Sequence, residues 1–167
     1  MFVGDEVRLD TGFAVARVRL VQLAGSGLLR TTSEEAYDLG TAGLARVGLP
    51  GLSKLVQVQS RDLASTERSV GLALRWEATG PGGGLFPVLD ADLILVGQGE
   101  RSCVLAMSGV YRPPLGALGQ ALDRAILHRV AAATIRDFLA QLAARIADPP
   151  GRYVRSQEGP SSPALNA

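Results

Sequence analysis

The stretch from Ser69 to Ala78 (SVGLALRWEA) decides the fold class, because an apolar side chain recurs at every second position. In an extended chain these side chains share one face: Val70, Leu72, Leu74, Trp76 and Ala78. A period of two predicts a strand with one face toward a core. Two further runs of this kind, at residues 85–96 and 102–112, are set off by the glycine-rich stretches at residues 80–84 and 97–99. We therefore predict an antiparallel meander joined by hairpin turns.

A single long helix is predicted after the meander, from residue 115 to residue 147. Pro113 and Pro114 end the last strand and suit the first helical positions, and Pro149 ends the helix. The apolar face changes sides between the two halves of this helix. The first half carries Leu118, Leu122, Ile126 and Val130, and the second half carries Ile135, Phe138, Leu142 and Ile146. We predict that the second half packs on the sheet, while the first half covers a cavity or contacts a second subunit.

The amino-terminal part is predicted to add further elements before this unit. Gly12 to Leu23 is rich in valine and leucine, which favours a half-exposed strand. Residues 31–33 offer hydroxyl caps for a helix that ends near Gly40, and Lys54 to Ser60 alternates as a short strand. The predicted fold is therefore α+β, a curved antiparallel sheet of about six or seven strands packed on a long C-terminal helix. Residues 1–150 form a single domain, and residues 151–167 are predicted to be a disordered tail.

Composition excludes several classes of partner. The 167 residues are 47% hydrophobic and 20% charged, with a net charge of +1. Scattered arginines on a nearly neutral chain argue against nucleic-acid binding. No apolar run is long enough to cross a membrane, so no integral membrane association is expected. Because Cys103 is the only cysteine, no internal disulfide can form, and we expect a cytoplasmic protein.

The residues that usually carry catalysis are scarce. His128 and Cys103 are the only histidine and cysteine, so we predict no metal site, no cofactor and no catalytic triad. The tripeptide Asp10-Thr11-Gly12 matches that of aspartic proteases, but a motif without its structural context is weak. Asp90 and Asp92 share one strand face and could form an acid pair with a raised pKa. The alternative, which we favour, is that this face meets solvent.

Three segments carry a resemblance to a known superfamily: LRWEATG at residues 74–80, LFPVLDADL at residues 85–93 and GVYRPPLG at residues 109–116. They resemble an actinobacterial subgroup of the SRPBCC superfamily, the START-like or helix-grip proteins that include lipid-transfer domains and aromatic cyclases. The resemblance covers Lys54 to Ala147, whereas the early helix pair of the superfamily is not evident in this sequence. It implies a sheet that grips the C-terminal helix around an apolar cavity. The superfamily has no universal catalytic motif, so the resemblance carries over no catalytic residue.

Three functions follow as hypotheses. The first is a module that binds a hydrophobic small molecule or lipid between sheet and helix. Its candidate lining is Trp76, Phe86, Leu105, Met107, Tyr111, Leu122, Ile126 and Arg129. The second is a cyclase or dehydratase acting on a polyketide-like substrate, with Asp90 or Asp92 as acid or base and Arg129 orienting an oxyanion. The third is a cavity-free dimer that uses the first half of the long helix as its interface.

Overall fold

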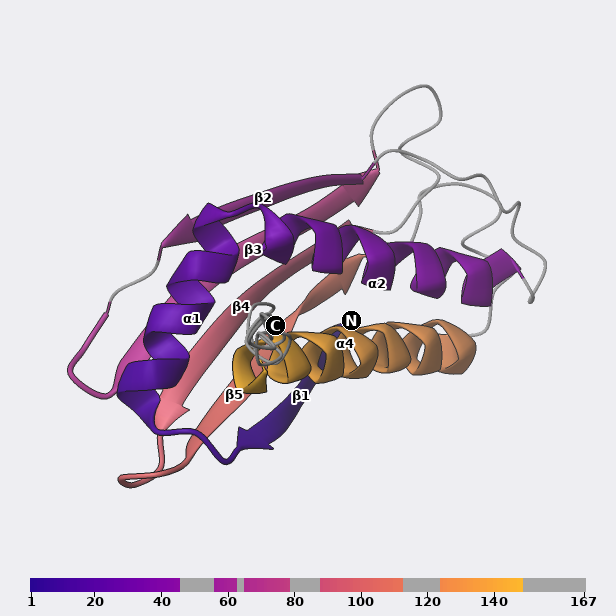
Figure 1. Cartoon of the computed structure of the whole chain (residues 1–167). Helices are drawn as coiled ribbons and strands as arrows, with labels where there is room; N and C mark the ends of the chain where they lie inside the picture. Colours follow the sequence, from indigo (N-terminus) through magenta and orange to yellow (C-terminus); the bar gives the residue numbers. More distant parts are fainter. Residues whose placement is uncertain (46–55, 63–64, 79–87, 113–123, 149–167) are drawn as a thin grey trace, which may run out of the picture.

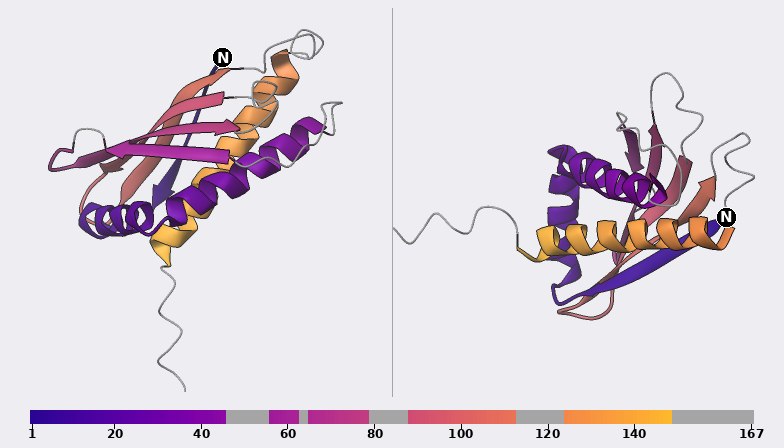
Figure 2. Two further views of the ribbon diagram at one scale, coloured as in Figure 1. Left: turned by 90° about the horizontal axis from the view of Figure 1, so that it is seen from above. Right: turned by 90° about the vertical axis from the view of Figure 1, so that its right-hand side faces the viewer.

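The structure, a computed structural model, describes residues 1–45, 56–62, 65–78, 88–112 and 124–148 (Figure 1). The elements are β1 (Phe2–Leu9), α1 (Phe13–Gly25), α2 (Leu28–Ala45), β2 (Val56–Asp62), β3 (Ser69–Ala78), β4 (Val88–Gly97), β5 (Cys103–Arg112) and α4 (Arg124–Ala147). The five strands form one antiparallel sheet in the order β1-β5-β4-β3-β2. All three helices lie on the same face of this sheet, with α4 along β1 and β5 (Figures 1 and 2). This arrangement is the predicted α+β helix-grip fold.

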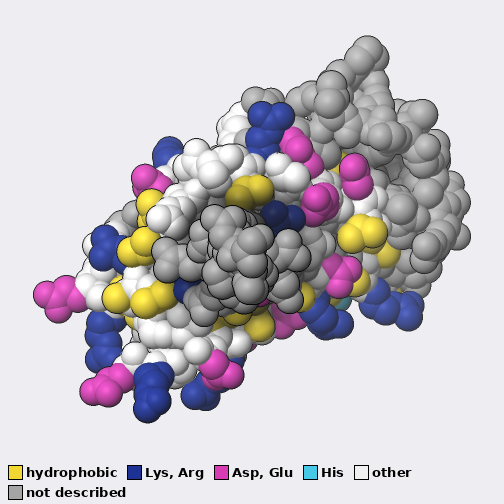
Figure 3. Space-filling model, viewed as in Figure 1, with side chains coloured by type: hydrophobic (Ala, Val, Ile, Leu, Met, Phe, Trp, Pro, Cys, Tyr) yellow, Lys and Arg dark blue, Asp and Glu magenta, His cyan; other side chains and the backbone are white. Residues whose placement is uncertain are grey.

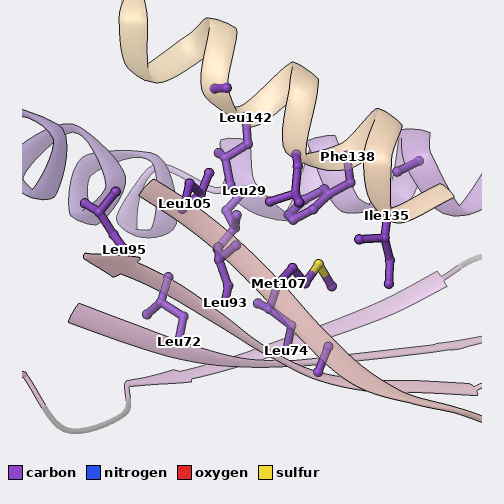
Figure 4. Close-up of a cluster of buried hydrophobic side chains, with 14 of the residues drawn as sticks. Leu29, Leu72, Leu74, Leu93, Leu95, Leu105, Met107, Ile135, Phe138 and Leu142 are labelled. Atoms are coloured by element: carbon purple, nitrogen blue, oxygen red, sulfur yellow. The ribbon is translucent and has the colours of Figure 1, made fainter. Parts of the chain in front are cut away.

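The face of the sheet toward the helices is built in rows of side chains that run across the strands. Register places Val70, Leu95 and Leu105 in one row, and Leu72, Leu93 and Met107 in the next. These six side chains are all buried. Figure 4 shows the five leucine and methionine side chains on the side of the sheet that faces the helices. The apolar residues that alternate along β3, β4 and β5 therefore face the helices, and the residues between them face solvent.

The second half of α4 supplies the opposite wall of the core. Ile135, Phe138, Leu142 and Ile146 are all buried, as their spacing predicted, and the close-up view shows the first three of them above the sheet (Figure 4). In the first half, Leu118 and Leu122 lie outside the described residues. The predicted division of labour along the helix is thus confirmed only for its second half.

The amino-terminal elements differ from the prediction. The segment predicted as a strand is helix α1, whose buried residues Ala16, Leu20 and Leu23 follow a helical period. Its three exposed valines misled the prediction, because β propensity is a weak guide against tertiary packing. The strand lies earlier, at β1, whose polar side chains hid its alternation. Helices α1 and α2 together form the early helix pair that the sequence did not reveal.

Helix α2 also begins earlier than predicted. Thr32 and Ser33 are not caps but lie inside the helix, where each hydroxyl donates to the carbonyl four residues before it, at 2.8 Å. Both side chains are fully buried, so this local bond satisfies a hydroxyl that has left water. The helix follows Gly27, whose positive φ of 78° ends α1 and turns the chain.

The described residues form five strands, fewer than the six or seven predicted, because the strand predicted at residues 12–23 is α1 and only β1 replaces it. The connection between β4 and β5 is the expected hairpin, with Gly99 at a φ of 126° and a bond from the Gln98 amide to the Ser102 carbonyl. The glycine run at residues 80–84, the prolines at 113 and 114, and the tail at 151–167 lie outside the described residues. No helix in the described part of the chain combines the length and apolarity needed to span a membrane.

Candidate functional site

An aromatic row ends the sheet on its helix-facing side. Trp76 of β3 pairs with Leu89 of β4, and Leu89 pairs with Tyr111 of β5, so the three side chains lie side by side across adjacent strands. Phe138 of α4 covers this row, with its ring 5.1 Å from that of Trp76 at an interplanar angle of 79°. Such an edge-to-face contact is a favourable aromatic geometry. β3 ends two residues after Trp76, and β5 ends one residue after Tyr111. The row therefore lies at one end of the sheet.

Two hydrogen-bond donors in this row are buried, and the described part of the chain offers neither of them an acceptor. The indole Nε1 of Trp76 and the hydroxyl of Tyr111 have no hydrogen-bond partner among the described residues. The side chains of both residues are almost inaccessible to solvent, at 1% and 6% exposure. Leaving a buried polar group without a partner costs about 1–3 kcal/mol, so an unpaired group in a native core requires an explanation. A bound molecule with an acceptor oxygen would supply one.

A second buried tyrosine lies near the aromatic row. Tyr37 of α2 is 6% exposed, and its pKa is raised above the ordinary value, first by burial and then by the neighbouring Tyr111, Asp38 and Glu77. Burial likewise raises the pKa of Tyr111. An ordinary phenol is already neutral at physiological pH, and the raised pKa keeps both of these phenols neutral into the alkaline range. The site offers hydrogen-bond donors in apolar surroundings, where such bonds are strong.

Gly109 lies next to the aromatic row, where β4 and β5 approach each other closely. It lies on β5 opposite Ala91 of β4, in the row adjacent to that of Tyr111. A Cβ atom at this position would stand 2.4 Å from the Asp90 carbonyl oxygen and 2.5 Å from the Ala91 Cβ. The close approach of the two strands thus requires glycine here.

Of the predicted lining residues, the structure brings four together on the helix-facing side. Trp76 and Tyr111 belong to the aromatic row, whereas Leu105 and Met107 lie in the aliphatic rows behind it. Phe86 and Leu122 fall outside the described residues, and so does the side chain of Ile126. Arg129 is exposed on α4, where its Nε donates to the Ala125 carbonyl at 3.4 Å.

The paired aspartates lie on the opposite face of the sheet. Leu89, Ala91, Leu93 and Leu95 are buried, which places Asp90 and Asp92 on the side without helices, as favoured from the sequence. Asp90 accepts hydrogen bonds from Arg75, at 2.8 Å, and from Arg112. A carboxylate on this face lies on the other side of the sheet from the aromatic row. The solvent-facing interpretation of Asp90 and Asp92 is therefore confirmed, and the alternative acid pair does not face the helices.

The remaining chemistry-bearing side chains form no second site in the part of the chain that the structure describes. His128 is exposed on α4, and Cys103 is buried, with its thiol 3.2 Å from the Thr11 carbonyl. Within the described ranges, no three His, Cys, Asp or Glu side chains lie close enough together to hold a metal ion. The tripeptide at Asp10 forms the turn from β1 into α1. A Cβ at Gly12 would stand 2.8 Å from the Glu100 carbonyl oxygen. The close approach of the Glu100 backbone therefore accounts for glycine at this position.

Sequence reasoning missed Tyr37 and assigned Phe138 only to the core. The buried side chains of α2 recur at Leu29, Thr32, Ser33, Ala36 and Tyr37, which is the spacing of one helix face. Two of them are polar, and this concealed the pattern. A search for helical spacing that accepted serine and threonine as buried residues would have found Tyr37.

Comparisons with known proteins agree with the fold. No family model and no curated protein sequence matches the chain. A hypothetical protein of Helicobacter pylori superposes with a TM-score of 0.53 at 13% identity, over 86% of each chain. A conserved protein of Geobacillus kaustophilus gives a TM-score of 0.51 at 13% identity, over 86% of this chain and 93% of that one. An aromatase/cyclase from Streptomyces sp. R1128 gives a TM-score of only 0.35 at 10% identity, over 90% of this chain and 98% of that one, and the agreement of the fold does not rest on it. At such identities the likeness concerns the fold alone.

Proposed function

We propose that this protein binds a hydrophobic small molecule or lipid between the aromatic end of the sheet and α4, and does so without catalysing a reaction. The observation that carries this proposal is the pair of buried donors, Trp76 Nε1 and Tyr111 Oη, with no acceptor among the described residues. The bound molecule is largely apolar, because Leu89 and Phe138 surround the donors. It carries at least one acceptor oxygen, because only an acceptor removes the cost of two unpaired donors.

The position of the row supports access from the end of the sheet. Trp76 lies two residues before the end of β3, Leu89 one residue after the start of β4, and Tyr111 one residue before the end of β5. The donors therefore lie closer to this end of the sheet than the aliphatic rows do. Those rows provide the rigid base on which a binding site needs to be built.

We expect no catalysis at this site, because the groups near the aromatic row are poor acids and bases. Raised pKa values keep Tyr37 and Tyr111 protonated at neutral pH, so neither is a ready base. The carboxylates offered by the cyclase alternative lie on the other side of the sheet, where Asp90 binds two arginines.

The test uses Trp76 as its own reporter, because it is the only tryptophan of the chain. cis-Parinaric acid, an apolar probe with carboxylate acceptors, is titrated into the purified protein while tryptophan fluorescence is followed. Native mass spectrometry of the same sample detects any co-purified apolar molecule. We expect saturable quenching by energy transfer and a bound mass.

Tyr111→Phe tests the donors directly. Because the Tyr111 hydroxyl has no acceptor among the described residues, its removal is expected to leave the ligand-free protein as stable as before, or more stable by about 1 kcal/mol. Probe binding is expected to weaken at least about fivefold. The matched control is Leu95→Met, a volume-conserving change at the far end of the core that leaves probe binding unchanged. A destabilisation of ligand-free Tyr111→Phe by more than about 2 kcal/mol, or equal probe affinity of wild type and variant, would refute the proposal.

A further inference from the structure

Helix α1 is apolar on nearly all sides. Its sequence, FAVARVRLVQLAG, contains three polar side chains in 13 residues. One of them, Arg19, is occupied at the end of α4, where it donates to the Ile146 and Ala147 carbonyls at 2.6 and 3.1 Å. A helix that is apolar all round is normally buried on all sides. Helix α1 has one face against the core and one face that no other described element covers.

The uncovered face is a row of valines. Val15, Val18 and Val21 are exposed by 48%, 56% and 54%, whereas Leu20 on the opposite side is fully buried. Hydrophobic side chains gather over α1 at the left of the space-filling view (Figure 3). Beside the valines runs an open groove of about 470 Å³. It is lined by Phe13, Ala14, Arg17, Val18, Val21, Gln22 and Glu67.

Two opposite charges flank this groove. Arg17 of α1 and Glu67, from the connection before β3, both line it, and neither forms an ion pair with any other described residue. An apolar centre with a charged rim is the anatomy of a protein interface. A surface that carries both signs at its own rim is complementary to a second copy of itself. The acidic rim residue argues against a membrane, whose anionic lipids attract faces with cations alone.

We propose that the valine face of α1 is the contact between two copies of this chain. In a two-fold arrangement the same patch is used twice, so a residue contact from one copy to the other is repeated in reverse. With the two α1 helices antiparallel, Val18 of each copy lies at the centre. Arg17 of each copy then pairs with Glu67 of the other. The inference is independent of the ligand site, which lies at the aromatic end of the sheet.

The experiment measures mass against concentration by light scattering coupled to size exclusion, and by sedimentation velocity, on the full chain. Wild type is expected to be a dimer at micromolar concentration. Arg17→Glu and Glu67→Arg each place like charges together and are expected to raise the dimer dissociation constant at least about tenfold. The double exchange Arg17→Glu with Glu67→Arg restores wild-type association, because the pair is rebuilt with reversed sign.

Val18→Lys tests the apolar centre, and Val110→Lys on the outer sheet face is its matched control. Val110 is a valine of similar exposure, at 48%, and lies far from α1 in the fold. Circular dichroism confirms that each variant is folded before it is compared. Monomeric Val18→Lys with dimeric Val110→Lys supports the proposal. A monomeric wild type at all concentrations, a dimer insensitive to Val18→Lys, or a double exchange that fails to restore association would overturn it, as would a monomer that sediments with anionic vesicles.

Discussion

The two ends of the core are built from different chemistry. At the end near α1, the row of Val70, Leu95 and Leu105 is purely aliphatic and leaves no polar atom to satisfy. At the other end, Trp76 and Tyr111 bring two buried donors that have no acceptor in the described structure. Hydrocarbon packing favours one tight arrangement, whereas unpaired donors favour a state in which something binds. The contrast predicts that mutations at the aliphatic end change stability, whereas mutations at the aromatic end change the proposed ligand binding.

The largest expected effect lies at the aliphatic end. Leu95→Ala removes a fully buried side chain and leaves a cavity, so we expect a loss of about 2–5 kcal/mol in the free energy of unfolding. Denaturant melts measure this loss, and parinaric acid titration of the folded variant should give wild-type affinity. A loss below about 1 kcal/mol would mean that this end is loosely packed, and the contrast between the ends would fail.

An intermediate effect is expected at the boundary between the ends. Gly109→Ala inserts a methyl group 2.4 Å from the Asp90 carbonyl oxygen, so β4 and β5 must separate. We expect a loss of about 1–3 kcal/mol in thermal or denaturant melts, the usual range for overpacking. Because the strain lies beside the aromatic row, probe binding should weaken as well. Unchanged probe binding would show that strain at Gly109 does not reach the aromatic row.

The last prediction concerns the tyrosines, whose effect on stability is absent at neutral pH and appears only at alkaline pH. Burial raises the folded-state pKa of Tyr37 and Tyr111 above the ordinary value of 10.0. The unfolded chain therefore loses these protons above about pH 10 while the folded chain keeps them. The stabilising effect is complete below that pH and is lost as pH rises further, by about 1.4 kcal/mol per pH unit for each tyrosine.

Tyr111→Phe should remove one of these two contributions. Denaturant melts between pH 9 and pH 12, with tyrosinate absorbance followed in parallel, measure the slope of stability against pH. A slope in Tyr111→Phe equal to that of wild type would show that this phenol ionises freely in the folded protein.

The sequence predicted the meander well because its signal is local. Alternation alone separates the buried from the exposed side of β3, β4 and β5, and it correctly predicted that Asp90 and Asp92 face solvent. The same reasoning failed at α1, where exposed valines are compatible with both a strand and an uncovered helix face. Only the position of the helix against the sheet distinguishes the two.

The candidate site was less accessible to sequence reasoning. Trp76 and Tyr111 were identified separately, but their place in one row depends on strand register, which pairs residues 35 positions apart through Leu89. Tyr37 comes from a different layer and has no sequence motif that links it to the others. The lack of acceptors among the described residues depends on how the interior is packed, and no residue spacing reveals it.

The pairing of β1 with β5 has a consequence for how the chain folds as it is synthesised. Phe2 lies opposite Val110 and Leu9 opposite Cys103, so the first strand in the sequence has its partner about a hundred residues later. At the translation rates of about 5–20 residues per second, β1 waits on the order of 5–20 s for that partner. Helix α4, which packs on β1, follows later still. The earliest part of the chain is therefore among the last to be fixed, and its unpaired edge is the stretch that chaperones would need to shield.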